Sequence, residues 1–402
     1  MGKPRRRVVC GFLVVGGLAA LSAALLAGMA IAFVRLSWPH TEPLGEPQFG
    51  INFSCRQAEY LLLESPALGP AGYVDRNRPG RAQWCADTLA TILTGTGARH
   101  VRISVEWSQV EPSADVYDFS VVDAELAAAE KSGANVLLSI GVKAQRNPEY
   151  YIPAWVLARV TLTEGEVVSN DPYLHDRALA MVRAVTAHVA RSNAIEAWAA
   201  DNEPYIASVR AGRWTLGPAF VRAEVAAIKA NDPRRRIVSI NQAQHFVFDR
   251  RWKQALADGD ALAASVYPFR NFDLFGHTVV VPILEMGPLG PNYAAQARAA
   301  HAAGKPFWIT ELQAEPWVDS DIRLVSPAHP SANLTPTRFE ENIEYARRSG
   351  ADRVYLWGAE WWLYERQHFG DSRWWDMAKA VLERSTSRRP AHLRLPPPQI
   401  WL

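Results

Sequence analysis

Eight short and nearly continuous apolar segments recur along the chain, and stretches with helical spacing separate most of them. Strands that are apolar throughout are buried on both faces, as in a parallel sheet covered by helices. The pattern predicts an α/β fold, a (β/α)8 (TIM) barrel over residues 49–384. The predicted strands are Phe49–Ser54, His100–Trp107, Asn135–Gly141, Ile195–Pro204, Arg236–Asn241, Ala261–Pro268, Pro306–Gln313 and Arg353–Trp362.

An open doubly wound sheet is the competing fold for such a pattern. That fold usually carries a Gly-rich phosphate-binding turn after its first strand. Here the first predicted strand runs directly into Cys55-Arg56-Gln57, which has no glycine. The barrel is therefore the favoured prediction.

Two glutamates stand at the predicted carboxyl ends of the fourth and seventh strands. Glu203 precedes Pro204, which cannot donate to a strand ladder, and Glu311 follows Ile309-Thr310. The active sites of such barrels lie at the carboxyl ends of the strands. Retaining cleavage of a glycosidic bond needs one protonated and one ionised carboxyl, about 5–5.5 Å apart. The two glutamates are thus candidates for this chemistry.

Asn202-Glu203-Pro204, together with Ile309-Thr310-Glu311, resembles the clan A glycoside hydrolases, the superfamily of cellulases, mannanases and β-galactosidases. The resemblance covers residues 49–364. It implies a retaining hydrolase of β-linked glycosides, in which Glu203 is the acid/base and Glu311 the nucleophile. It further implies that Asn202 binds the sugar 2-hydroxyl and that the reaction requires no metal and no organic cofactor.

Three more residues lie at strand positions that have functional roles in this clan. The segment Val101–Trp107 is similar to the clan's second strand, which implies that Arg102 supports the nucleophile. Tyr267 resembles the tyrosine that hydrogen-bonds the nucleophile, and Trp357 resembles the tryptophan that floors the sugar subsite. A structural salt bridge, a core tyrosine and barrel packing are the respective alternatives.

The sequence departs from the clan at the end of the third strand. Many members have a histidine there or on strand five or six, whereas this strand ends in Gly141-Val142-Lys143. His245, after strand five, either replaces that histidine or is a solvated loop residue, and the second reading is favoured. Further carboxylates that could bind sugar hydroxyls are Glu106, Asp201, Glu315 and Glu360. Glu315 could compete with Glu311, although it lies four residues further along.

Composition favours a carbohydrate partner over a nucleic acid. The net charge is +2, which provides no large electrostatic footprint for nucleic acid. The chain has 15 Trp, whose faces suit either sugar stacking or core packing. Those near predicted strand ends are Trp107, Trp198, Trp308, Trp317, Trp357, Trp361 and Trp362.

The N-terminus has the charge pattern of an export signal. A basic stub (residues 1–7) precedes an uncharged stretch (8–34), long enough to span a bilayer as a helix. A single-pass signal-anchor is favoured over a cleaved signal, although Ala30-Ile31-Ala32 resembles a cleavage site. Either way the barrel would lie outside the cytoplasm, after a linker (35–48) and before a basic, Pro-rich tail (385–402).

Cys55 and Cys85 lie in the exported part, whereas Cys10 lies at the membrane entry. The pair is expected either to form a disulfide or to remain two buried thiols. Two other functions stay open beside hydrolysis. One is a non-catalytic carbohydrate-binding protein on a degenerate barrel, and the other is a transglycosylase that uses the same residues.

Overall fold

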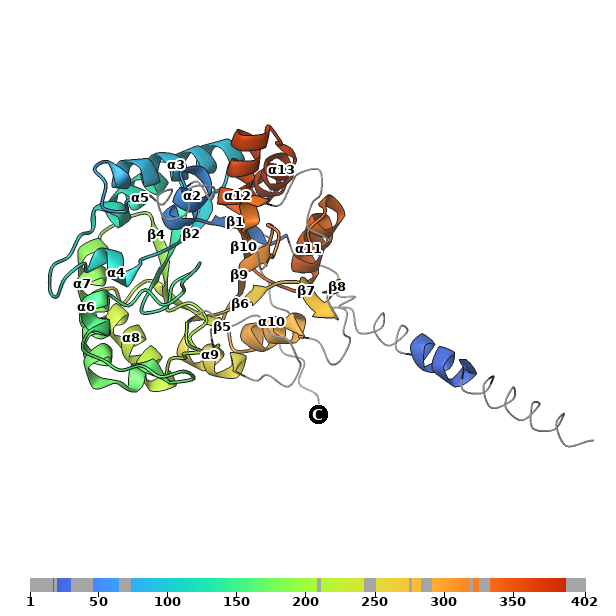
Figure 1. Cartoon of the computed structure of the whole chain (residues 1–402), viewed down its shortest axis with the longest axis horizontal. Coiled ribbons are helices and arrows are strands. Elements are labelled where there is room, and N and C mark those ends of the chain that lie inside the picture. Colours follow the sequence, from blue (N-terminus) through green and yellow to red (C-terminus); the bar gives the residue numbers. More distant parts are fainter. Residues whose placement is uncertain are drawn as a thin grey trace, which may run out of the picture.

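Eight parallel strands form a closed barrel in the order β1-β10-β9-β6-β5-β4-β3-β2 (Figure 1). The computed structural model describes residues 17, 20–29, 46–64, 74–207, 211–241, 251–274, 277–282, 291–318, 321–324 and 333–387. The predicted barrel is confirmed. Its strands are β1 (Gln48–Asn52), β2 (His100–Ser104), β3 (Asn135–Ile140), β4 (Ile195–Ala200), β5 (Arg236–Asn241), β6 (Ala261–Val266), β9 (Phe307–Gln313) and β10 (Arg353–Trp357).

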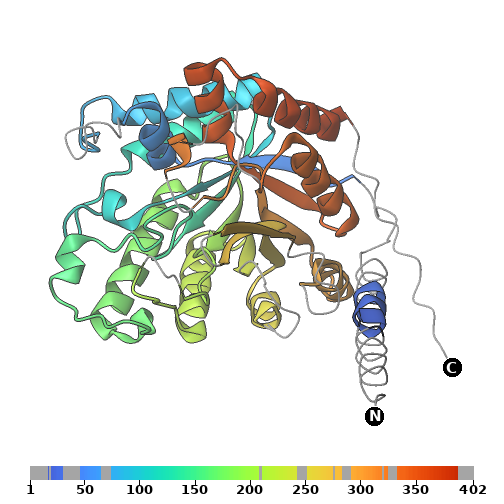
Figure 2. The same cartoon turned by 45° about the vertical axis from the view of Figure 1, so that its right-hand side comes forward.

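Helices surround the strands on the outside of the barrel (Figure 2). Several begin with a side-chain cap or with proline in the first turn, and several end before a left-handed glycine. They are α2 (Cys55–Leu62), α3 (Arg81–Thr96), α4 (Trp107–Val110), α5 (Ser120–Lys131), α6 (Ala154–Leu157), α7 (Pro172–Val189), α8 (Pro218–Asn231), α9 (Trp252–Asp258), α10 (Tyr293–Ala302), α11 (Pro336–Arg348), α12 (Ala359–Tyr364) and α13 (Arg373–Ser387).

The apolar core has two parts, inside and outside the ring of strands. Inside, alanines on β4 and β6 leave room for the large rings of Trp308 and Tyr355, whose centroids lie 6.2 Å apart. Outside, the alternate strand residues pack against the helices. The interior is therefore filled by side chains, and the polar residues that could act on a ligand lie at the carboxyl ends of the strands.

The structure differs from the prediction at several elements; β2 and β10, for example, end at Ser104 and Trp357, before the predicted ends. β4 ends at Ala200 rather than Pro204, because Asp201 and Glu203 adopt positive φ angles of 58° and 46°. An antiparallel hairpin, β7 (Phe269–Leu274) with β8 (His277–Pro282), lies between β6 and α10 and was not predicted. Finally, α13 continues to Ser387, into the first residues of the predicted tail.

The predicted membrane anchor is not confirmed. Of residues 8–34 the structure describes only 17 and 20–29, which are helical and exposed. Within the described part of the chain, no helix combines the length and apolar character needed to cross a bilayer. Cys10, His245 and residues 388–402 lie outside the described residues, as does the linker up to residue 45.

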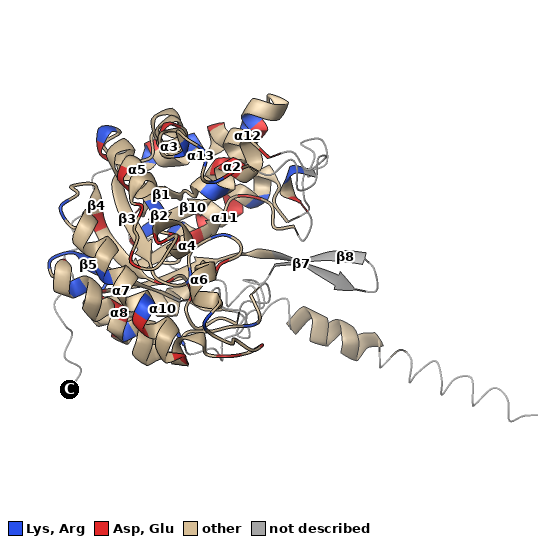
Figure 3. Cartoon of the chain, turned by 60° about the vertical axis from the view of Figure 1, so that its left-hand side comes forward, with Lys and Arg blue, Asp and Glu red and all other residues tan. Residues whose placement is uncertain are grey.

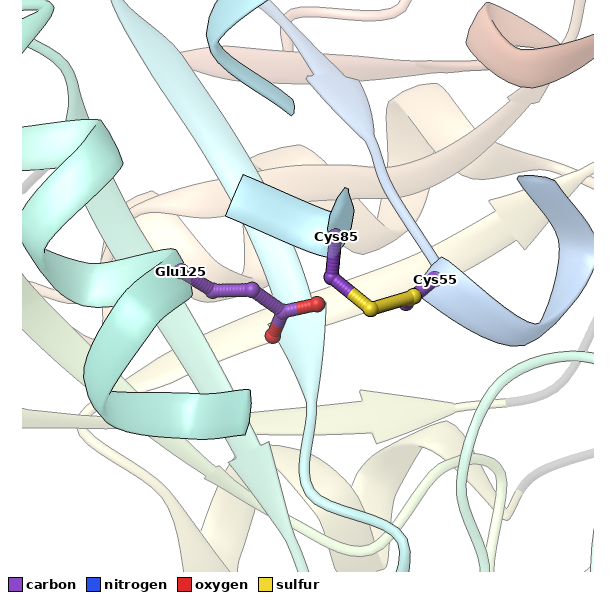
Figure 4. A group of neighbouring side chains, drawn as sticks. All are labelled: Cys55, Cys85 and Glu125. Carbon is purple, nitrogen blue, oxygen red and sulfur yellow. A yellow bond between two sulfur atoms is a disulfide. The ribbon is translucent and has the colours of Figure 1, made fainter. Parts of the chain in front are cut away.

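Cys55 and Cys85 form a disulfide that joins the start of α2 to α3, with their Cα atoms 5.3 Å apart. Of the two readings of these cysteines, the disulfide is confirmed. Figure 4 shows the carboxyl group of Glu125, from α5, directed toward this bridge. Acidic and basic residues are interspersed on the outer helices (Figure 3), in keeping with the small net charge.

Candidate active site

A β-bulge in β9 turns Glu311 toward the other polar residues of the site. Ala264 of β6 pairs with Ile309, but the next residue, Ser265, pairs with Glu311, so Thr310 is the extra residue. Trp308 belongs to the inner core, and strict alternation would direct Glu311 outward. One inserted residue reverses that direction, which is a common use of bulges beside active sites.

Arg102, on β2, links both candidate catalytic segments. Its Nη1 donates to Glu311 Oε1 at 2.9 Å, and its Nη2 donates to Asn202 Oδ1 at 2.8 Å. Ser139 and Asn52 accept further hydrogen bonds from the guanidinium at 3.1 and 3.4 Å. The side chain is fully buried. A fixed, charged guanidinium of this kind holds a carboxylate ionised and in one orientation.

Tyr267, directly after β6, holds the second oxygen of the same carboxylate. Its hydroxyl donates to Glu311 Oε2 at 2.6 Å. The edge of the Tyr267 ring packs against Trp317, at a centroid distance of 4.6 Å. Glu311 thus receives one strong donor on each oxygen and is only 4% exposed. These two donors fix the Glu311 carboxylate in one orientation.

Glu203 lies in a different environment, on the turn after β4. The side chain is half-buried, and burial together with the neighbouring Glu311 raises the pKa of Glu203 to about 7. Lys143 acts in the opposite direction. At neutral pH a substantial fraction of this carboxyl therefore carries a proton. The two glutamates have different surroundings, and such differences are the usual basis for separate acid and nucleophile roles.

Trp357 ends β10, five residues before the predicted end of this strand, and it is only 9% exposed. The guanidinium of Arg146 stacks on its ring, with Cζ 3.9 Å from the ring centroid. Arg146 also makes ion pairs with Glu315 and with Glu360, the latter at 2.9 Å. Glu315 and Glu360, two of the carboxylates considered as sugar ligands, are thus both paired with Arg146.

The other candidate carboxylates are also engaged. Glu106 accepts a hydrogen bond from Arg56 at 3.0 Å. Asp201 is fully buried, accepts the backbone N–H of Lys143 at 2.7 Å and lies beside the buried Glu224 of α8. Burial and the adjacent Asp201 hold the pKa of Glu224 well above its usual range, so Glu224 is the protonated partner.

Most of the tryptophans near strand ends pack in the core rather than in the site. Trp317 is half-buried beside Tyr267, and Trp357 is almost buried under Arg146. The remaining five, each 3% exposed or less, are Trp107, Trp198, Trp308, Trp361 and Trp362.

One group of potential metal ligands occurs among the described residues, formed by Cys55, Cys85 and Glu125. Both sulfur atoms belong to the disulfide and offer no thiolate. The group does not adjoin Glu203 or Glu311 in sequence or through any hydrogen bond described above. It fits a metal poorly.

Comparisons with known proteins find similarity to proteins described as glycosidases. A family model described as β-galactosidase, of glycoside hydrolase family 42, matches residues 81–212. An exo-β-1,4-mannosidase from an Opitutaceae bacterium is similar in structure, with a TM-score of 0.53 and 18% identity over 84% of this chain and 60% of that chain. A β-galactosidase from the Antarctic haloarchaeon Halorubrum lacusprofundi gives a TM-score of 0.56 and 15% identity, over 85% of this chain and 58% of that chain.

The resemblance to the clan A glycoside hydrolases is confirmed. A third structure, a family 5 subfamily 18 protein from Streptomyces cattleya in complex with GlcNAc, has a TM-score of 0.51 and 15% identity, over 86% of this chain and 82% of that chain. At such identities the likeness establishes the barrel fold. The chain spans about three-fifths of the length of the first two structures. A search of curated proteins by sequence finds no match.

Sequence reasoning brought five residues to this end of the barrel: Arg102, Asn202, Glu203, Tyr267 and Glu311. It missed three others, Asn52, Lys143 and Arg146. Asn52, 1% exposed, donates to the carbonyl of Thr310 at 2.9 Å and so braces the bulge. Asn52 and Lys143 could have been found because each follows an apolar segment. A polar side chain in such a place is rarely buried without a partner.

Proposed function

We propose that this protein is a retaining β-glycoside hydrolase in which Glu311 is the nucleophile and Glu203 the acid/base. The observation that carries the proposal is the difference between the surroundings of two neighbouring glutamates. Arg102 and Tyr267 each donate to one oxygen of Glu311, at 2.9 and 2.6 Å. Burial and Glu311 raise the pKa of Glu203 to about 7. One carboxyl is thereby prepared to attack and the other to deliver a proton.

The reaction has two steps. In the first, Glu311 attacks the anomeric carbon while Glu203 protonates the leaving oxygen, which gives a covalent glycosyl-enzyme. In the second, Glu203, now ionised, removes a proton from water, and that water displaces Glu311 from the anomeric carbon. Asn202, whose Oδ1 is occupied by Arg102, would present its amide N–H to the sugar 2-hydroxyl. That contact strengthens in the transition state.

The names of the similar structures suggest where to begin with substrates. They include β-galactosidases and an exo-β-1,4-mannosidase. We therefore propose β-galactosides and β-mannosides as the first glycones to test.

A mechanism-based label tests the proposal directly. The purified chain would be incubated with activated 2-deoxy-2-fluoro β-glycosides, including the galactoside and mannoside, and its intact mass recorded. We expect a sugar-sized adduct on the wild type, at the peptide that contains Glu311. Glu311→Gln should give no adduct. Glu315→Gln, the matched control at the rival carboxylate, should still be labelled at Glu311.

Three other outcomes would contradict part of this proposal. An adduct on Glu315 would overturn the assignment of the nucleophile. Glycan binding by calorimetry with no adduct from any sugar would favour a non-catalytic binding protein. An adduct that is released faster by sugar acceptors than by water would favour transglycosylation with the same residues.

We further propose that the barrel is exported and held at the cell membrane by residues 8–34. The supporting observations are the basic residues that precede this uncharged stretch and the disulfide between Cys55 and Cys85, a bond typical of oxidising compartments. Intact mass of the protein extracted from membranes would distinguish an uncleaved N-terminus from cleavage after residue 32. Protease treatment of intact cells should digest the barrel. Protection of the barrel under these conditions would contradict the proposal.

A further inference from the structure

Lys143, in the loop that follows β3, contacts three consecutive residues of the turn that carries Glu203. Its backbone N–H donates to Asp201 Oδ1 at 2.7 Å, and its carbonyl accepts the N–H of Asn202 at 2.8 Å. Its Nζ donates to the carbonyl oxygen of Glu203 at 3.0 Å. Lysine is seldom buried, yet Lys143 is only 1% exposed. One residue thus holds each member of the turn by a separate hydrogen bond.

The turn needs such support because its backbone is strained. Asp201 and Glu203 have φ angles of 58° and 46°, in the left-handed region that disfavours residues with a Cβ. Each such residue is less stable than one with ordinary backbone angles. The strain persists only where surrounding contacts fix the conformation. Lys143 lies just beyond β3, the strand that pairs with β4, so its contacts also fix the position of the turn relative to the barrel.

We propose that Lys143 is a positioning residue for the acid/base, holding the Asp201–Glu203 turn in its strained form and placing a positive charge beside the Glu203 carboxyl. This inference rests on the proposed function of Glu203. It names a role for a residue at the end of the predicted third strand, a segment that has no histidine.

The charged groups around Lys143 and Glu203 predict the direction in which each substitution should shift the pKa of Glu203. Glu149 Oε2 lies 3.3 Å from Lys143 Nζ, and the Tyr150 ring centroid lies 5.8 Å from it. Lys143 lowers the pKa of Glu203, whereas Glu149 raises it. Other groups that interact with the Glu203 carboxyl are Glu311, Ser265 and Tyr267. Removing the lysine charge and removing the Glu149 charge should therefore have opposite effects.

The test compares Lys143→Met and Glu149→Gln with the wild type in the full chain. The rate kcat/KM would be measured against pH on a glycoside with a poor leaving group. In the first step Glu203 must be protonated, so the rate falls as pH rises through its pKa. For Lys143→Met we expect the alkaline limb to move up by about one pH unit and the maximal rate to fall about 10-fold. For Glu149→Gln we expect the limb to move down by about half a unit.

Lys379→Met is the matched control, because Lys379 is a half-exposed lysine on α13 that pairs with Glu383 of the same helix at 3.7 Å. Its profile should superimpose on that of the wild type. The inference is overturned if the Lys143→Met and wild-type profiles coincide, or if both site variants move the limb in the same direction. If Lys143→Met does not fold, the pH profile of Glu149→Gln is the deciding test. An alkaline limb at the same pH as in the wild type, or at a higher pH, then overturns the inference.

A second readout separates this inference from the proposed function. Infrared difference spectra, with Glu203→Gln subtracted, follow the carboxyl band of protonated Glu203 during a pH titration without any substrate. Opposite shifts of that titration in the two site variants support the role of Lys143 even if no glycoside is cleaved. Identical titrations in all three proteins would refute it even in an active hydrolase.

Discussion

At the scale of single residues, two chemically identical side chains receive different properties from their partners. Glu311 has a donor on each oxygen, from Arg102 and Tyr267. Glu203 is raised in pKa to about 7 by burial and by the negative charge of Glu311. Glu311 is held by side chains on β2 and directly after β6, whereas Glu203 lies on the turn after β4.

Glu203→Gln tests the residue scale. Proton donation contributes about 10²–10⁴-fold to such reactions, so we expect a loss of that size with poor leaving groups. With activated aryl glycosides, whose leaving groups need little protonation, the first step should be nearly unaffected. The fall in kcat/KM above about pH 7 should also disappear, because the group that titrates is gone.

The measurement is kcat/KM across a series of aryl glycosides whose leaving groups differ in pKa, for wild type and variant at several pH values. An equal loss with good and poor leaving groups would contradict the acid/base assignment.

At the scale of elements, a helix packed beside the disulfide contains a buried acid. Glu125 of α5 is 4% exposed and faces the bridge between α2 and α3 (Figure 4). Burial raises the pKa of Glu125 to about 8, with Arg81 acting in the opposite direction. In the unfolded chain this glutamate would titrate near its ordinary value of about 4.3.

The sign of the resulting pH dependence follows from proton linkage. Between about pH 4.5 and pH 8 the unfolded state loses this proton while the folded state retains it, so the contribution of Glu125 to stability falls as pH rises. Glu125→Gln cannot ionise and should be more stable than wild type by roughly 2–4 kcal/mol at pH 8.5, and similar to it at pH 4.5.

Urea unfolding at the two pH values, with the disulfide intact, measures this difference. Glu130→Gln is the control, since Glu130 is exposed on the same helix. A gain at pH 8.5 no larger than that of the control would show that Glu125 does not carry a buried proton.

At the scale of the whole molecule, the barrel closes where β1 enters between β10 and β2. Gly50 of β1 pairs with Tyr355 of β10, and a Cβ at Gly50 would lie 2.5 Å from the carbonyl oxygen of His100 on β2. Because that obstacle is backbone, the strands would have to separate to admit a methyl group.

Gly50→Ala should therefore destabilise the barrel by about 3 kcal/mol or more, as overpacking of a rigid core does. Thermal unfolding measures the loss. Gly217→Ala is the control, because a Cβ there meets no atom closer than 3.4 Å. Equal melting temperatures for the two variants would mean that β1 and β2 can adjust without cost.

By itself the sequence determined the barrel, because eight doubly buried strands leave an uninterrupted apolar pattern that any short window reveals. It also placed six candidate site residues within or at the ends of predicted strands: Arg102, Asn202, Glu203, Tyr267, Glu311 and Trp357. The disulfide was one of two readings that the spacing of Cys55 and Cys85 left open, and the fold decided between them by bringing the two Cα atoms to 5.3 Å.

Only the tertiary structure decided how these residues meet. The bulge at Thr310 that turns Glu311 inward depends on pairing with β6 and β10. The left-handed turn at Glu203 depends on Lys143, which is distant in sequence. The Arg146 guanidinium that covers Trp357 comes from the loop after β3. Each of these is a contact between segments far apart in the chain, and local sequence patterns specify neighbours along the chain rather than neighbours in space.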